Sequence, residues 1–189
     1  MEITTISIHK DNYREGRSGY VIQGIVLHMM QGTLAGTDAW FGGKNIQAGV
    51  YSSAHEGIGK NGDVHVYVKP EDTAYHAGRI NQPVWPMVIN NPSINPNIYL
   101  YGIELEGFRG DTWTEAQMQS LVLRVQEILV KYNLPPTRAM LVSHNDIAKD
   151  KEDVRNFCDE VIKRINSIPT PVPSKEEIKK QIKELVDKL

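Results

Sequence analysis

Hydrophobic and polar positions divide the chain into short apolar runs separated by polar turns. GIVLH (24–28) and MLVSH (140–144) are apolar, rich in branched side chains, and each ends in a histidine. Runs of this length predict buried strands. The segment 53–68 contains two further strand-like runs on either side of Asn61-Gly62, a pair that favours a hairpin turn because both residues tolerate positive φ.

LYGIELEGF (100–108) predicts another strand, and its pattern places acidic and apolar side chains on opposite faces. Because side chains alternate along a strand, Glu104 and Glu106 share one face while Ile103 and Leu105 share the other. One face of this strand is therefore expected to pack in the core, and the other is available for chemistry.

Apolar residues with helical spacing predict two longer helices. The first begins near Thr114, ends before Asn133, and carries an apolar stripe; its members are Met118, Leu121, Val122, Val125, Leu129 and Val130. The second spans about 153–166. A short helix is expected to begin at Thr37 or Asp38 and to end at Gly42-Gly43, and the Pro- and Asn-rich segment 79–98 predicts a long irregular loop. The pattern indicates one α/β domain over residues 1–167.

The last residues differ in character from this domain. Three prolines within 168–174 predict a stiff, extended linker. Residues 175–189 favour an amphipathic helix with a heptad seam at Ile178, Ile182, Leu185 and Leu189. Two heptads are too short for a stable isolated coil. The helix can be interpreted as a self-association element, as a helix packed on the domain, or as the stub of a further binding domain.

Composition excludes some classes of partner. The formal net charge is -2, so no basic field is present to attract nucleic acid. No run is apolar enough to span a bilayer, and the N-terminus lacks the features of a signal peptide. The single cysteine, Cys158, fits a reducing compartment and a buried position on the last helix. We therefore expect synthesis in the cytoplasm, without membrane insertion.

The two histidines at strand ends are candidate metal ligands. A strand fixes the backbone while its end opens into a cleft, where His28 and His144 can be presented rigidly. A structural histidine bonded to nearby backbone is the alternative for either residue. Asp153 lies nine positions after His144, close enough to reach the same site, and zinc in hydrolases takes three such ligands. By itself, however, this segment favours Asp153 as a helix N-cap. Lys151 is suited to stabilise a developing oxyanion; the alternative is that residues 150–153 form a solvated charged turn before the helix.

Four motifs in order carry a resemblance to a known family. They are IVLHMMQGT around His28, SAHEGIGKNGDVHVYV from 53, YHAG at 75–78 with GIELEG at 102–107, and SHNDIAKDKED from Ser143. Over roughly 24–165 the chain resembles the zinc-dependent N-acetylmuramoyl-L-alanine amidases, which include phage lytic enzymes, the cytosolic muropeptide-recycling amidase and the animal peptidoglycan recognition proteins. The resemblance implies a central mixed β-sheet flanked by helices.

The resemblance also assigns roles to residues. It implies that Zn²⁺ is held by His28, His144 and Asp153, that Lys151 stabilises the tetrahedral intermediate, and that Glu104 helps activate the attacking water. Where the family usually has Pro-Gly after the third ligand, this chain has Val154-Arg155, and Asp150 is the alternative third ligand.

Three further residues are candidates for substrate binding. His76 lies in the HAG motif, which lines the cleft without supplying a ligand. His55, on the hairpin, either faces the cleft or packs. Trp85, like Trp40, either stacks on a sugar or packs in the core.

The resemblance is greatest to phage or prophage lytic members, so we expect a bacteriolytic endolysin that cuts bacterial peptidoglycan between N-acetylmuramic acid and L-alanine. It would reach the wall through holin-type delivery or lysis. The alternatives are a cytosolic recycling amidase and a non-catalytic peptidoglycan-binding module.

Overall fold

A computed structural model describes residues 1–152 and 154–168 of the chain. The predictions made for Asp153, for nearly all of the linker, and for the helix 175–189 lie outside these residues.

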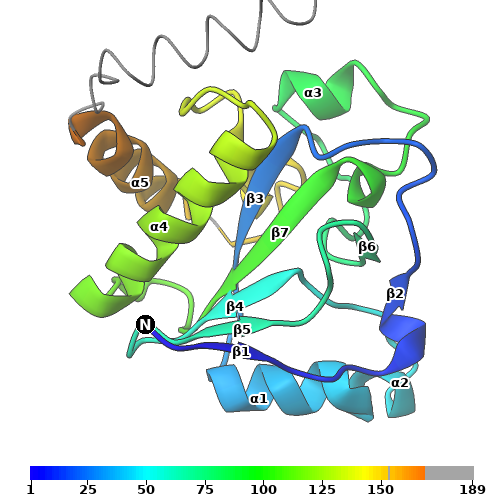
Figure 1. Ribbon diagram of the computed structural model, residues 1–189. Helices are drawn as coiled ribbons and strands as arrows, with labels where there is room; N and C mark the ends of the chain where they lie inside the picture. The colour runs from blue at the N-terminus through cyan, green and yellow to red at the C-terminus, as the bar shows by residue number, and fades with distance from the viewer. Residues whose placement is uncertain (153, 169–189) are drawn as a thin grey trace, which may run out of the picture.

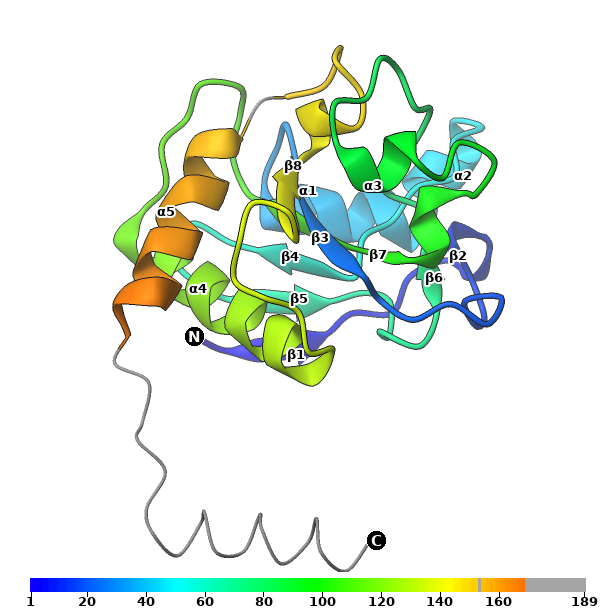
Figure 2. The ribbon, with the colours of Figure 1, turned by 90° about the horizontal axis from the view of Figure 1, so that it is seen from above.

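The centre of the molecule is a six-stranded mixed sheet in the order β1-β5-β4-β7-β3-β8 (Figures 1 and 2). The neighbouring apolar strands β7, β3 and β8 run parallel, with β8 at the edge of the sheet, and β4 is also parallel to β7. Only the pairing of β5 with β4 is antiparallel. The mixed sheet flanked by helices confirms the predicted fold class. The bounds are β1 Ile3–Thr5, β3 Gly24–Met29, β4 Glu56–Ile58, β5 Val64–Val66, β7 Leu100–Leu105 and β8 Leu141–Ser143.

One face of the sheet is covered by two helices, α4 (Glu115–Lys131) and α5 (Arg155–Ser167), which lie side by side in Figures 1 and 2. The Thr114 side chain caps α4 by accepting a hydrogen bond from the N–H of Gln117. The helix stops before Asn133, whose φ is 53°. The largest apolar cluster lies between these helices and the sheet, and it includes the inward side chains of β3, namely Ile25, Leu27 and Met29.

Described segments cover the opposite face at its two ends. Near β4 and β5 lies a helical segment formed by α1 (Leu34–Ala39), the π-helical turn Trp40–Lys44 and α2 (Asn45–Gln47). Against β3, β7 and β8 lies α3 (Pro86–Ile89), whose apolar residues form a second cluster with those strands. A small sheet joins β2 (Tyr13–Arg14) to β6 (Thr73–Ala74). The remaining elements are the 3₁₀ turns Lys10–Asn12, Pro96–Ile98 and His144–Asp146.

Some local predictions differ from the structure. The short helix begins earlier than expected, because Thr33 and not Thr37 or Asp38 caps it by accepting from the N–H of Gly36. The turn between β4 and β5 spans 59–63, and of its predicted central pair only Gly62 has positive φ. The expected loop 79–98 contains two helical turns, α3 and Pro96–Ile98.

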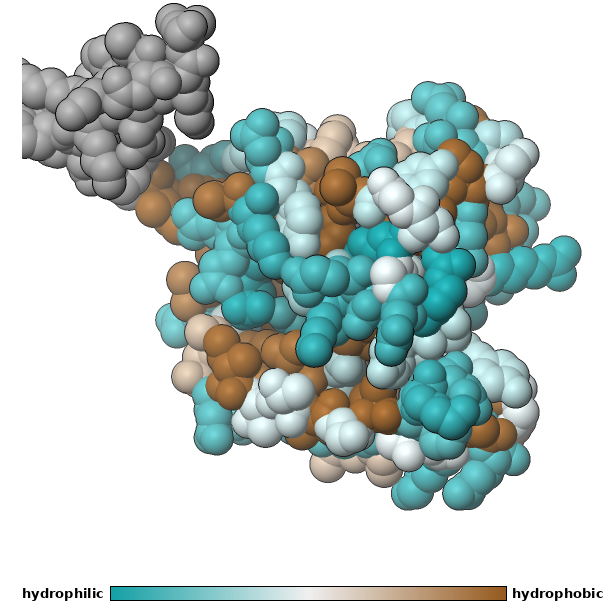
Figure 3. All heavy atoms as spheres, turned by 45° about the vertical axis from the view of Figure 1, so that its right-hand side comes forward, coloured by the Kyte–Doolittle hydropathy of each residue, from teal (hydrophilic) through white to brown (hydrophobic). Residues whose placement is uncertain are grey.

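Two observations concern the helices and the outer surface. Among the described residues, no helix combines the length and apolar character needed to cross a membrane. On the face turned forward in Figure 3, hydrophilic side chains surround small hydrophobic areas.

Candidate functional site

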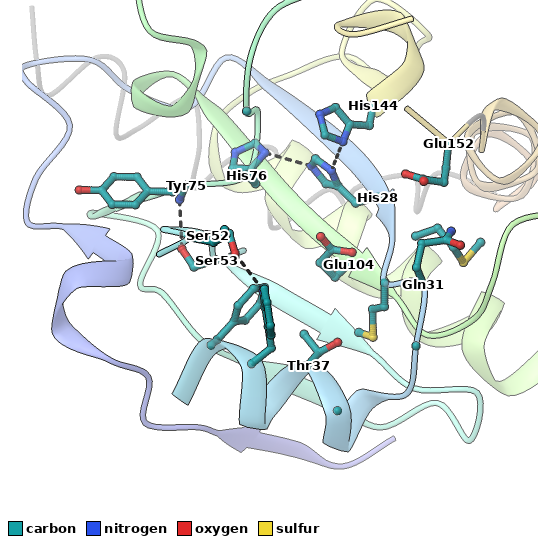
Figure 4. Close-up of a pocket in the computed structure, with 18 of the residues that line it drawn as sticks. His28, Gln31, Thr37, Ser52, Ser53, Tyr75, His76, Glu104, His144 and Glu152 are labelled. Atoms are coloured by element: carbon teal, nitrogen blue, oxygen red, sulfur yellow. Dashed lines mark hydrogen bonds between the residues drawn. The ribbon is translucent and has the colours of Figure 1, made fainter. Parts of the chain in front are cut away.

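The open part of the sheet brings strand-end polar residues together. His28 on β3 is the register partner of Glu104 on β7. Both alternate with the core residues of their strands and therefore point away from α4 and α5. His144 follows β8 directly as the first residue of a 3₁₀ turn. Figure 4 shows the two histidines facing each other, with Glu104 beside them.

The imidazole rings of His28 and His144 meet through the same nitrogen of each ring. Their Nδ1 atoms are 2.8 Å apart. Two nitrogens bound to one tetrahedral zinc at about 2.0–2.1 Å would be separated by about 3.3 Å, so small ring rotations convert one arrangement into the other. Nε2 of His144 lies 3.1 Å from the carbonyl oxygen of Ala77. If Nε2 carries the proton and donates it to that oxygen, Nδ1 has its lone pair free.

Both histidines are held in the neutral form that a metal ligand requires. Burial lowers the pKa of His28 well below its ordinary value, and His144, His76 and Lys151 lower it further. Burial also lowers the pKa of His144. At neutral pH the two rings therefore carry lone pairs and no charge.

His76 contacts His28 at the ring nitrogen that does not face His144. Its Nδ1 lies 3.0 Å from Nε2 of His28, and its pKa is lowered to about 3 by burial and by His144. Its ring lies against Gly102, where an added Cβ would sit 2.4 Å from Cγ of His76. The Asn97 side chain accepts hydrogen bonds from the N–H groups of His76 and Ala77, at 3.0 Å and 2.8 Å. Asn97 thus fixes both groups that orient the two candidate ligands.

Charged groups are gathered at the same end of the cleft. Glu104, Lys151 and Glu152 line it together with the three histidines. Burial, with a smaller contribution from Glu152, raises the pKa of Glu104 to about 8. Oε2 of Glu104 is buried and has no hydrogen-bond partner within the described part of the chain. An unpartnered buried carboxyl oxygen is costly, so its persistence here indicates a functional role.

The cleft continues past these groups along α1 and has a volume of about 610 Å³. Its far wall carries uncharged side chains, several of them aromatic, and Figure 4 shows part of this wall below the histidines. The wall residues are Thr37, Trp40, Tyr51, Ser52, Ser53 and Tyr75. The site therefore combines a polar, charged end with an uncharged groove large enough for part of a polymer.

The structure brings together most of the predicted site residues: His28, His144, Glu104, Lys151 and His76 all line the cleft. Asp153 lies outside the described residues. The alternative ligand, Asp150, is exposed, and its Oδ1 accepts a hydrogen bond from Asn81 at 2.9 Å.

Two predicted substrate contacts do not lie in the cleft. His55 is fully buried and stacks on Tyr101, and its Nδ1 accepts from the N–H of Gly102 at 3.0 Å. Trp85 is 4% exposed in the second apolar cluster, where its indole donates to the carbonyl of Ala139. Both are structural in this fold, because neighbouring backbone groups and rings occupy the surfaces that a substrate would need.

Other cleft residues were not predicted as part of the site. The sequence pattern assigns Glu152 only to the charged segment 150–153. Ser52, Ser53 and Tyr75 flank recognised motifs, but no spacing rule marked them. Asn97 sits in the segment predicted to be irregular, where a buried amide gives no local signal.

Within the described ranges, no three His, Cys, Asp or Glu side chains form a group ready to hold a metal. His28 and His144 place two ring nitrogens 2.8 Å apart, and small ring rotations would bring them to the separation that zinc requires. The donor set therefore fits zinc, provided that one more ligand comes from elsewhere in the chain.

Comparison with known proteins adds a family assignment. The family model described as N-acetylmuramoyl-L-alanine amidase matches residues 18–156. No curated protein matches the chain.

Among solved structures, the amidase LysC from Clostridium intestinale is similar with a TM-score of 0.62 and 19% identity, over 86% of this chain and 97% of that one. A selenomethionine derivative of AmpD gives a TM-score of 0.60 and 20% identity, over 93% and 92% of the two chains. The hydrolase AmiA from Staphylococcus aureus gives 0.62 and 15%, over 88% and 82%. These three structures share the fold of this chain over most of its length.

Proposed function

Since the chain belongs to the N-acetylmuramoyl-L-alanine amidase family, whose activity is hydrolysis within peptidoglycan, we propose that it uses one zinc ion held by His28, His144 and Asp153. The facing Nδ1 atoms of His28 and His144 carry this proposal. A bound zinc ion would supply a Lewis acid and a nucleophile available at neutral pH.

The protein's own groups would perform the proton transfers and position the ligands. The backbone carbonyl of Ala77 orients His144, and His76 orients His28. Glu104 would accept the proton of the attacking water and pass it to the leaving amine. Burial raises the pKa of Glu104 to about 8, and a nearby cation would lower that pKa and favour the carboxylate. The ammonium group of Lys151 would stabilise negative charge that develops on the amide oxygen.

The substrate would be the bond between N-acetylmuramic acid and L-alanine in intact walls, as in a lytic endolysin. Two observations support this: the cleft is open along α1, and a similar solved structure is described as an endolysin amidase from Clostridium intestinale. Soluble muropeptides are the second candidate substrate, because the family that the sequence resembles also includes muropeptide-recycling amidases.

Metal analysis of four single variants tests the ligand set. We expect His28→Ala, His144→Ala and Asp153→Ala to lose zinc and amidase activity, and Asp150→Ala, the matched control, to keep both. Retained zinc in Asp153→Ala together with zinc loss in Asp150→Ala would transfer the third position to Asp150.

Substrate type is tested separately by comparing release of stem peptides from intact sacculi with release from soluble anhydro-muropeptides. Cleavage of the soluble substrate alone would refute the lytic proposal while leaving the amidase activity standing.

A further inference from the structure

The uncharged wall of the cleft presents two aromatic side chains to solvent. Trp40 is 39% exposed and Tyr51 is 62% exposed, although both line the cleft. Aromatic rings beside hydroxyl groups provide a large, rigid contact area with few rotatable bonds. The wall is therefore suited to an uncharged ligand that has an apolar face and hydrogen-bonding groups.

The backbone of this wall is irregular and needs support from another segment. After α1 the chain makes the π-helical turn Trp40–Lys44, in which Gly43 has a φ of 133°. Gly43 thus interrupts the helical backbone of this turn with a kink. The carbonyl of Phe41, within this turn, accepts from the N–H of His9 at 2.9 Å and from Nδ2 of Asn12 at 2.7 Å. The N-terminal segment thus binds the wall directly.

The main link is a buried pair of amides, Asn12 and Asn45, both 0% exposed. Nδ2 of Asn12 donates to Oδ1 of Asn45 at 3.0 Å, and Nδ2 of Asn45 donates to Oδ1 of Asn12 at 2.7 Å. Both amides also form hydrogen bonds with the backbone of Ser52 in the wall. Asn12 accepts from the N–H of Ser52, and Asn45 donates to the carbonyl of Ser52. All four hydrogen-bonding positions of Asn12 are filled, with the Phe41 carbonyl as the fourth partner.

Further hydrogen bonds connect this pair to residues that line the cleft. The indole N–H of Trp40 donates to Oγ of Ser52 at 3.2 Å. The hydroxyl of Ser53 donates to the carbonyl of Asn12 at 2.6 Å and accepts from the N–H of Tyr75 at 3.0 Å. Figure 4 shows Ser52, Ser53 and Tyr75 together along this side of the cleft. These hydrogen bonds therefore connect Trp40 on one side of the wall, and Ser53 with Tyr75 on the other, to Asn12.

We propose that Asn12 is a positioning residue for substrate binding, holding the Trp40–Tyr51 wall through Asn45, Ser52 and Ser53 so that it packs against an uncharged part of the substrate. This inference rests on the proposed function, because it takes the cleft as the peptidoglycan site. The ligand chemistry is that of a pyranose face or of the first residues of a stem peptide. Asn12 precedes residue 18, where the family match begins, whereas its partners Asn45, Ser52 and Ser53 lie within the matched range.

The test is Asn12→Asp, which keeps the shape and the two acceptor bonds but removes both donors. On a soluble muramyl peptide we expect KM to rise about tenfold while kcat stays within about twofold, since only uniform binding is lost. Asn45→Asp should show the same split. Val125→Ala, in the opposite core, is the control for lowered stability and should leave KM unchanged.

A second readout does not depend on catalysis. The indole N–H signal of Trp40, assigned with Trp40→Phe, is followed by NMR while metal-free protein is titrated with an N-acetylglucosamine oligosaccharide or with a free stem peptide. In the wild type one of these ligands should shift the signal, which identifies the source. In both Asn variants the signal of the free protein should move and the affinity should fall.

The two readouts separate failure of this inference from failure of the proposed function. A wild-type protein that cleaves no muropeptide but shows the Trp40 shift would refute the proposed substrate and leave the positioning role standing. Unchanged KM and an unchanged Trp40 signal in both Asn12→Asp and Asn45→Asp would overturn the positioning role. A wild-type Trp40 signal that responds to neither ligand would overturn the wall as a binding surface.

Discussion

Substitution of Gly102 by alanine tests the claim that His76 positions His28. The added Cβ would lie 2.4 Å from Cγ and 2.7 Å from Nδ1 of the His76 ring. Carbon atoms in contact normally stay about 3.5 Å apart, so the ring must move by about 1 Å. Its Nδ1 is now 3.0 Å from Nε2 of His28, and a shift of that size breaks this contact.

The magnitude follows from two separate costs. Overpacking of this kind costs about 1–3 kcal/mol, which in a protein of this size lowers Tm by about 2–4 °C for each kcal/mol. Loss of an interaction that orients a metal ligand typically weakens metal binding about 10–100-fold. We therefore expect Gly102→Ala to remain folded at 25 °C, to bind zinc more weakly in competition with a chelator, and to lose amidase activity at limiting zinc.

The control is Gly42→Ala, because a Cβ at Gly42 has no other atom within 4 Å. This variant adds the same methyl group and should bind zinc as the wild type does. A double-mutant cycle with His76→Ala locates the effect: once the ring is absent, Gly102→Ala should cost nothing further in zinc affinity. Zinc affinity in Gly102→Ala equal to that of the wild type would refute the reasoning that His76 orients His28.

Three further outcomes are expected. Glu104→Gln should keep its zinc, measured by metal analysis, and lose about 10²–10⁴-fold in kcat, because the amide cannot take up the proton; unchanged kcat would remove Glu104 from the mechanism. Arg124→Met should lower the free energy of unfolding in urea by about 3–5 kcal/mol. The substitution removes the guanidinium that pairs with the carboxylate of Glu56, which is 1% exposed, and among the described residues leaves it the hydroxyl of Tyr101. A loss below about 1 kcal/mol would contradict this. Cys158, buried and with a pKa raised to about 12 by burial, should resist iodoacetamide at pH 8 until the protein is unfolded, and rapid labelling of folded protein would contradict the burial.

The parts of the site that could be predicted from sequence are those with a local pattern. His28 and His144 end continuous apolar runs, and the parallel pairing of β3 with β8 brings those ends together. The alternation of β7 correctly put Glu104 on the face away from Ile103 and Leu105. Periodicity fixes the face of a strand, and parallel pairing fixes which strand ends meet.

The failures concern side chains whose environment is made by distant segments. Trp85 lies in a Pro- and Asn-rich stretch, and nothing local shows that its indole packs on Gly24, where an added Cβ would be 2.6 Å from the ring. His55 belongs to a recognised motif, yet it stacks on Tyr101, 46 positions away along the chain. Asn12 and Asn45 have no pattern at all, because a buried amide pair is specified only by the fold that encloses it.

The family match begins at residue 18, but residues before it belong to the folded domain. Arg17 is 6% exposed, and its guanidinium donates to the carbonyls of Pro70, Asn97 and Leu100 while lying against His55. Removing it would take a donor away from several carbonyls, and each one left without a partner would cost about 1–3 kcal/mol, against a total stability of about 5–15 kcal/mol. Those carbonyls belong to the segments that lead into His76 and into β7. Residues before the matched region therefore hold the backbone on which the candidate catalytic groups stand.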